Sequence, residues 1–117
     1  MRPVANVFHA GDGNLHPNIL FDMRDKGVMG QVEKAGEEML HAVVELGGTL
    51  SGEHGIGNEK NAFMPWIFAP DDLDAMQRVK RVLDPKGMLN PGKIFPDPDR
   101  EPKLVARTGR ASEANWW

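Results

Sequence analysis

The stretch VANVFHAGDGNLHPNIL, residues 4–20, places a glycine-rich centre between two apolar runs. The first run, PVANVF at 3–8, alternates its side chains between two faces, and the second run is NILFDM at 18–23. Short runs of this kind, bounded by Gly, Asp and Asn, are typical of β-strands. We therefore expect two strands that flank a loop, and Gly11 and Gly13 allow that loop to turn sharply because glycine tolerates positive φ.

The segment that follows predicts a long amphipathic helix. From residue 27 onward, apolar residues recur at steps of three and four, at Val28, Val32, Ala35, Met39 and Val43. Gly47 and Gly48 supply a backbone suited to a left-handed stop. Beyond them we expect a very short strand at 49–51, a short helix at 59–68 and a second helix from residue 70 that ends before Pro85.

This order of elements predicts an α+β fold. A small antiparallel sheet is expected to pack on the long helix and to be followed by a helical C-terminal segment. The prolines and glycines of 84–102 indicate turns and extended chain. Residues 1–96 are expected to form the folded region, and 97–117 a flexible tail. A sheet this small is thin for an independent unit, so the chain is expected to be part of a larger structure.

Composition excludes several classes of function. The chain has 117 residues with a net charge of −3 and no run of either sign, which argues against nucleic acid as a partner. No apolar stretch approaches the roughly 20 residues of a membrane span, so we expect no span and a cytoplasmic location. With no cysteine, histidine and carboxylate are the expected ligands for a transition metal.

The two glycine-rich loops carry the candidate chemistry. His9 and His16 bracket the first loop, and the second loop, GEHGIG at 52–57, offers Glu53 and His54. Two neutral imidazoles and one carboxylate form the open three-ligand set of a catalytic divalent metal. If loop geometry aims both imidazoles at one point and Glu53 completes the set, the adjacent His54 can act as a general base.

Other interpretations stay open at this point. Each histidine can equally be a surface or turn residue, and His41, which lies on the predicted helix without a glycine context, is assigned to that class. Neither loop has the G-x-G-x-x-G pattern of a dinucleotide site or the Lys-Ser/Thr of a phosphate loop. Ser51 does not lie in a nucleophile elbow.

Three blocks of the sequence together resemble a known family. They are HAGDGNLHPNIL at 9–20, GGTLSGEHGIGNEK at 47–60 and VKRVLDPKGMLNPGKIF at 79–95. They resemble the signature blocks of the C-terminal domain of FAD-linked oxidases, in the vanillyl-alcohol oxidase superfamily, and most closely its glycolate oxidase catalytic subunit and D-lactate dehydrogenase types. The resemblance runs from Val4 to Pro96 and implies a partial cap domain.

The resemblance also implies an activity and roles for single residues. It implies an FAD-dependent dehydrogenase or oxidase of a small 2-hydroxy acid, in which the hydroxyl loses a proton to a base while hydride passes to flavin N5. His9, His16 and Glu53 match the positions that hold a divalent metal, frequently zinc. His54 matches the proposed catalytic base. Asn18 matches a position near the substrate carboxylate, and Asn90 one near the flavin.

The chain departs from the family's pattern in extent. It resembles the last quarter of the full enzyme, and the family's N-terminal FAD-binding domain has no counterpart in it. We therefore expect that the chain alone neither retains FAD tightly nor turns over substrate. Its partner is expected to be that missing domain or a flavoprotein or electron-transfer subunit, and apolar surface left uncovered is expected to cause self-association. Asn61 also stands where a basic residue is common.

Two other functions remain as hypotheses. The chain can be a stand-alone metal-binding or regulatory module that associates with a flavoprotein partner. It can also be a metal-dependent hydrolase that uses the His/His/Glu set and a bound water.

Overall fold

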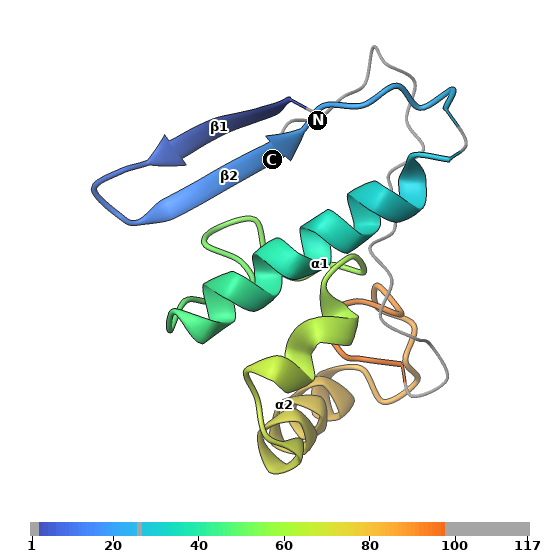
Figure 1. The fold of residues 1–117 in the computed structure, drawn as a ribbon. Coiled ribbons are helices and arrows are strands. Elements are labelled where there is room, and N and C mark those ends of the chain that lie inside the picture. Colours follow the sequence, from blue (N-terminus) through green and yellow to red (C-terminus); the bar gives the residue numbers. More distant parts are fainter. Residues whose placement is uncertain (1–2, 26, 98–117) are drawn as a thin grey trace.

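The computed structural model describes residues 3–25 and 27–97. The elements follow in the order β1 (Val4–His9), β2 (Asn14–Ile19), α1 (Met29–Glu45), the 3-10 helix η1 (Asn61–Trp66) and α2 (Pro70–Leu83). The two strands form a hairpin that runs alongside α1, while η1 and α2 lie on the other side of that helix (Figure 1). The predicted α+β class is confirmed. Of the predicted tail, all but Asp97 lies outside the described residues.

The hairpin begins its second strand earlier than expected. The antiparallel register pairs His9 with Asn14 and Val7 with His16, so β2 already contains the second histidine. The turn at 10–13 is closed by the Asp12 N–H, which donates to the His9 carbonyl at 3.0 Å, and Gly13 has φ +69°. The prediction of a strand at 18–23 was therefore wrong in its bounds, because this short turn lets pairing start directly after Gly13.

Helix α1 ends as the two glycines predict. The Gly48 N–H donates to the Val43 carbonyl at 2.8 Å, and the Gly47 N–H donates to the Val44 carbonyl at 3.0 Å. Gly47 has φ +82°, so this is the Schellman arrangement with a left-handed glycine after the cap. All residues of α1 are described and none of them is buried, so its apolar stripe is only partly covered.

The core lies between the second half of α1, η1 and α2. Its buried members are Leu50, Phe63, Met64 and Leu73, and α1 contributes the partly buried Leu40 and Val44. Leu50 is 2% exposed and stands at the start of the second glycine-rich loop, which therefore leaves the core from a fixed point. The prediction of a strand at 49–51 was wrong: within the described residues that segment pairs with no strand, and its central side chain enters the helical core instead.

The C-terminal helices agree with the sequence in place. The short helix expected at 59–68 is the 3-10 helix η1, with Pro65 inside it, and α2 ends at Leu83 as predicted. The N-terminus of α2 is satisfied by Asp72, whose carboxylate accepts a hydrogen bond from the Ala69 N–H at 3.1 Å.

The turns after α2 are fixed by buried polar side chains. The Asp84 carboxylate accepts hydrogen bonds from the N–H groups of Met88 and Leu89 and from the Lys80 ammonium, at 2.9–3.0 Å. The Lys80 ammonium holds the pKa of Asp84 below its ordinary value. Asn61, which is 4% exposed, donates from Nδ2 to the carbonyls of Gly92 and Phe95 at 3.3 and 3.2 Å.

Large apolar side chains remain exposed on two elements. On the hairpin, Phe8 and Leu15 are 55% and 65% exposed, and on α2, Val82 and Leu83 are 80% and 75% exposed. These surfaces agree with an incomplete domain, and self-association through them stays a prediction. Across residues 3–25 and 27–97, no helix has the length and apolar character needed to cross a membrane.

The left-handed stop of α1 gives a stability test. Gly47→Ala forces a side chain into the φ +82° conformation, at a cost of about 1–2 kcal/mol. We expect the midpoint of thermal unfolding, followed by circular dichroism, to fall by roughly 4–8 °C for each kcal/mol lost. The matched control is Gly30→Ala in the first turn of α1, where an added Cβ meets open space. Equal midpoints for the two variants would contradict the left-handed cap.

Candidate metal site

The two histidines of the hairpin share one face because of strand geometry. Successive side chains in a strand alternate between faces, and paired residues point the same way. His9 pairs with Asn14, and His16 is two residues beyond Asn14, so both imidazoles leave the same face. Their ring centroids are 5.4 Å apart. We expected loop geometry to aim them, but both lie on strands, and the pleat aims them instead.

The second glycine-rich loop brings a carboxylate to the two imidazoles. Glu53 Oε1 lies 3.3 Å from His9 Nε2 and 3.3 Å from His16 Nε2. Within the described part of the chain, these three residues form a cluster whose ligand atoms all lie within 4.8 Å of one another. The three predicted metal ligands are thus brought together in space from segments about 40 residues apart in the sequence.

The cluster has a buried side and an open side. The His16 side chain is 8% exposed, and its Nε2 is fully buried and has no hydrogen-bond partner within residues 3–25 and 27–97, although Glu53 Oε1 lies 3.3 Å away. Glu53 and His9 are about half exposed. A buried imidazole nitrogen without a hydrogen bond is unfavourable. A bound cation would satisfy His16 Nε2, and the open side would admit substrate or water.

The donor distances suit a metal ion. Ligands placed about 2.1 Å from a tetrahedral ion are about 3.4 Å from each other. The two distances of 3.3 Å from Glu53 Oε1 to the imidazole nitrogens match that separation. Two imidazoles and one carboxylate are also the donor set of catalytic zinc sites, in which a further position stays open. These residues therefore fit a divalent metal.

His54 lies at the edge of this cluster. Its Nε2 is 3.5 Å from the same Glu53 oxygen, and its ring centroid is 5.0 Å from that of His16. It does not belong to the three-donor set found among the described residues, so it remains beside the candidate metal position. The predicted base and the predicted ligands thus occupy one small region.

The two predicted asparagines lie in different places. Asn18 follows His16 by two residues on β2, so it is on the same face, and its Nδ2 donates to the His16 carbonyl at 3.1 Å. Asn90 lies in the exposed turn after α2 with φ 46°. Figure 1 shows that turn beside α2, with α1 between it and the hairpin. Asn18 is therefore placed close to the cluster, and a flavin contact by Asn90 stays a prediction.

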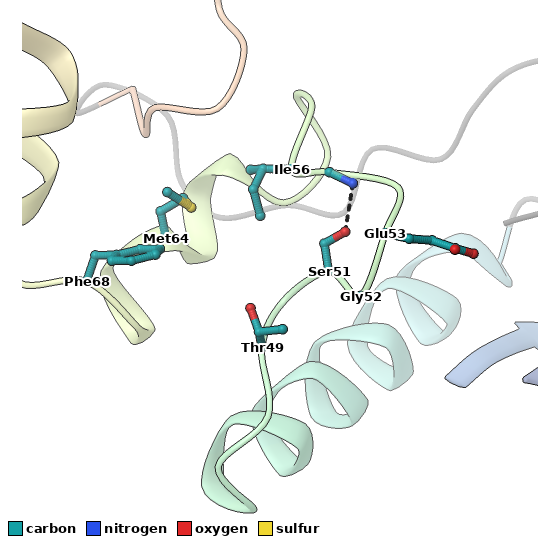
Figure 2. A pocket seen from close by; sticks show the side chains of 8 residues that line it. Thr49, Ser51, Gly52, Glu53, Ile56, Met64 and Phe68 are labelled. Atoms are coloured by element: carbon teal, nitrogen blue, oxygen red, sulfur yellow. Dashed lines mark hydrogen bonds between the residues drawn. The ribbon is translucent and has the colours of Figure 1, made fainter. Parts of the chain in front are cut away.

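The loop that carries Glu53 also borders a hollow on its other side. This hollow has a volume of about 340 Å³ and is lined mainly by Thr49, Ser51, Ile56, Met64 and Phe68. Figure 2 shows that the Glu53 carboxylate points away from these side chains. Glu53 is also among the residues that line the hollow, so the hollow adjoins the histidine cluster at this residue.

Side chains outside the sequence-based set also shape this loop. Lys60 donates from Nζ to the Leu50 carbonyl at 2.9 Å, and burial lowers the pKa of its ammonium. The Ser51 hydroxyl accepts a hydrogen bond from the Gly55 N–H at 2.7 Å. The sequence signal for Ser51 was weak: a serine four residues before a glycine in a loop that carries two candidate site residues.

The chain is similar to known proteins of one family. The model of the family described as FAD linked oxidases, C-terminal domain, matches residues 3–94. The glycolate oxidase subunit GlcD of Escherichia coli (strain K12) is 52% identical over 93 residues, which cover 80% of this chain and 19% of that protein.

Two further relatives have lower identity. GlcD of Bacillus subtilis (strain 168) is 42% identical over 103 residues, which cover 88% of this chain and 22% of the relative. The mitochondrial D-lactate dehydrogenase [cytochrome] of Arabidopsis thaliana is 37% identical over 90 residues, covering 77% of this chain and 16% of the relative. The resemblance read from the three sequence blocks is confirmed, and the chain spans about a fifth of the length of these curated relatives.

The contact between loop and hairpin can be tested at Gly52. A Cβ at this position would lie 2.2 Å from Asn14 Oδ1, so Gly52→Ala must displace the Asn14 amide. We expect a loss of roughly 0.5–1 kcal/mol in the free energy of unfolding by urea, because the atoms that the Cβ meets belong to the end of the Asn14 side chain, which can rotate away. In the double variant with Asn14→Ala the clash is absent, and the two changes should couple by at least about 0.5 kcal/mol.

The control for Gly52 is Gly11→Ala. No atom lies within 4 Å of a Cβ added at Gly11, so this change should stay within about 0.5 kcal/mol of wild type. Strictly additive effects of Gly52→Ala and Asn14→Ala would show that the loop does not press on the hairpin.

Proposed function

This chain belongs to the FAD-linked oxidase C-terminal domain family, and from that premise we propose that it supplies the metal-binding and proton-accepting side of an active site. The enzyme would be an FAD-dependent 2-hydroxy-acid dehydrogenase or oxidase of the glycolate or D-lactate type. The names of the relatives support the substrate class. The observation that carries the proposal is the meeting of His9, His16 and Glu53 at one point.

We propose that these three residues hold a divalent metal, with zinc the best match to the donor set. Imidazole and carboxylate ligands suit zinc, and the chain has no cysteine to offer a thiolate. When bound, the metal would supply a Lewis acid that polarises an oxygen of the substrate. His16 would anchor the buried side, while His9 and Glu53, each about half exposed, leave room for the hydroxy acid.

His54 is proposed as the general base. Oxidation of a 2-hydroxy acid removes the hydroxyl proton and a hydride from the adjacent carbon, so the site must provide a proton acceptor. His54 Nε2 lies 3.5 Å from Glu53 Oε1, and this distance supports a base within reach of a substrate oxygen held at the cluster. Asn18, on the same strand face, is proposed to donate a hydrogen bond to the substrate carboxylate.

The hydride acceptor, FAD, is proposed to be held by another part of the enzyme. The residues that the structure describes do not enclose a dinucleotide: the hollow behind the loop is open, and Asn90 lies in an exposed turn. Because the chain spans about a fifth of its relatives' length, an FAD-binding domain or flavoprotein subunit is the proposed partner. A cytoplasmic location stays a prediction.

Zinc binding tests the ligand set. We expect the purified chain to bind one Zn²⁺, measured by competition with a chromophoric chelator, and to gain about 2.7 kcal/mol of stability at a metal concentration 100 times Kd. His9→Ala and Glu53→Ala should each weaken the affinity at least about a hundredfold, since even outer residues of metal sites contribute 10–100-fold. The control is His41→Ala on α1, which should bind as wild type does. Equal affinities for all four chains would exclude this cluster.

Flavin binding tests the partial nature of the site. After incubation with excess FAD and gel filtration, the chain alone should retain no stoichiometric flavin and should not reduce a dye in the presence of D-lactate or glycolate. Chain unfolded by heat provides the baseline for non-specific retention. Tight binding of one FAD together with turnover would contradict the proposal. Zinc binding without any effect on a co-expressed flavoprotein partner would favour the stand-alone metal-binding module.

A further inference from the structure

The turn that carries Glu53 and His54 is closed by a serine. The Gly55 N–H donates to Ser51 Oγ at 2.7 Å, and the three residues between them are Gly52, Glu53 and His54 (Figure 2). We propose that Ser51 is a positioning residue that sets the place of the carboxylate and of the adjacent imidazole. This inference rests on the proposed function, because it concerns the same metal-binding site.

The geometry around Ser51 leaves it without direct contact to the cluster. Its side chain borders the hollow behind the loop, whereas the Glu53 carboxylate points to the other side (Figure 2). The Ser51 hydroxyl is therefore not offered as a metal ligand or as a group that touches substrate. It acts on the site through the backbone of the turn.

The ends of the loop are fixed by other groups. Lys60 Nζ donates to the Leu50 carbonyl at 2.9 Å, and Leu50 itself is buried in the core. At the other end, the Ile94 N–H donates to the Gly57 carbonyl at 2.7 Å, which ties the loop to the turns after α2. The hydrogen bond from the Gly55 N–H to Ser51 Oγ lies between these two anchors. It can therefore fix the conformation of residues 52–54, which carry the candidate site residues.

The tip of the loop, residues 52–55, must be held within a narrow range of positions for the site to bind a metal. Glu53 Oε1 is 3.3 Å from both hairpin imidazole nitrogens, and coordination distances tolerate changes of about 0.2 Å. Gly52 lies directly against the Asn14 side chain on one side, and on the other side of the turn Gly55, which has φ +85°, donates its N–H to Ser51. Loss of the Ser51 acceptor would let the tip move away from the hairpin while the anchors stay in place.

The test compares Ser51→Ala with Ser51→Thr, which keeps an oxygen at the same position. The matched control is Thr49→Val, which removes a hydroxyl from the same hollow. We expect Ser51→Ala to weaken Zn²⁺ affinity roughly three- to tenfold, the effect of one lost hydrogen bond. Ser51→Thr should restore it to within about twofold, Thr49→Val should not change it, and the metal-free unfolding midpoint of Ser51→Ala should stay within about 4 °C of wild type.

A second measurement needs no metal. In NMR spectra of the metal-free chain, wild type and Ser51→Thr should show contacts between the His16 ring and the Glu53 side chain and slow exchange of the Gly55 amide. Ser51→Ala should lose both. If wild type binds no zinc, the proposed function fails, and these spectra alone decide the role of Ser51. Unchanged spectra in Ser51→Ala, or an unchanged zinc affinity where wild type binds, would overturn the inference.

Discussion

The meeting of one carboxylate oxygen with the imidazoles of a separate hairpin is the interaction on which this structure depends. The buried apolar residues among those described are Val28, Leu50, Phe63, Met64 and Leu73, and none of them belongs to β1 or β2. A two-stranded hairpin has little stability of its own. Its most buried polar group, His16, lies against Glu53, so the same contact that defines the candidate site also orients the hairpin on the rest of the chain.

Metal binding at the proposed site would be coupled to folding. A ligand set drawn from two segments is complete only when both are in place, so the binding free energy also stabilises their relative position. His16 Nε2 is buried and has no hydrogen-bond partner in the part of the chain that the structure describes. The hairpin contributes no residue to the buried apolar cluster found among the described residues, so its polar contact with the Glu53 loop matters for its position. A bound ion would strengthen this contact and would thereby stabilise both the site and the placement of the hairpin.

The sequence predicts the parts of this structure that depend on local periodicity. The helix that ends before Gly47 and the helix that ends before Pro85 follow from apolar spacing and from the conformations of glycine and proline. The grouping of His9, His16 and Glu53 was conditional on the loop geometry, and the family resemblance is what singled out these three positions. Strand bounds fail because the position of β2 depends on pairing with β1. The expected strand at 49–51 fails for a related reason, since a strand needs a neighbour and Leu50 is drawn into a helical core instead.

Hydrogen bonds from side chains to backbone groups far away in the sequence cannot be predicted from such patterns. Asn61 donates hydrogen bonds to the carbonyls of Gly92 and Phe95, 31 and 34 residues away, and no periodicity marks it. The family resemblance implies only that it stands where a basic residue is common. In the buried position it occupies, a neutral amide satisfies two carbonyls without the cost of burying a charge.

The orientations of the site residues have both local and distant causes, and only the local ones can be predicted from the sequence pattern. The alternation of side chains along the strands orients the two imidazoles, and this orientation can be predicted once the strand register is known. The carboxylate is aimed by the loop's attachment to the core and to the turns after α2, through Leu50 and Gly57. A mutation far from the cluster that loosens either attachment would move the carboxylate and leave the imidazoles in place. Displacement of Glu53 alone would therefore disrupt the proposed ligand set, and the position of Glu53 depends on contacts in the rest of the chain.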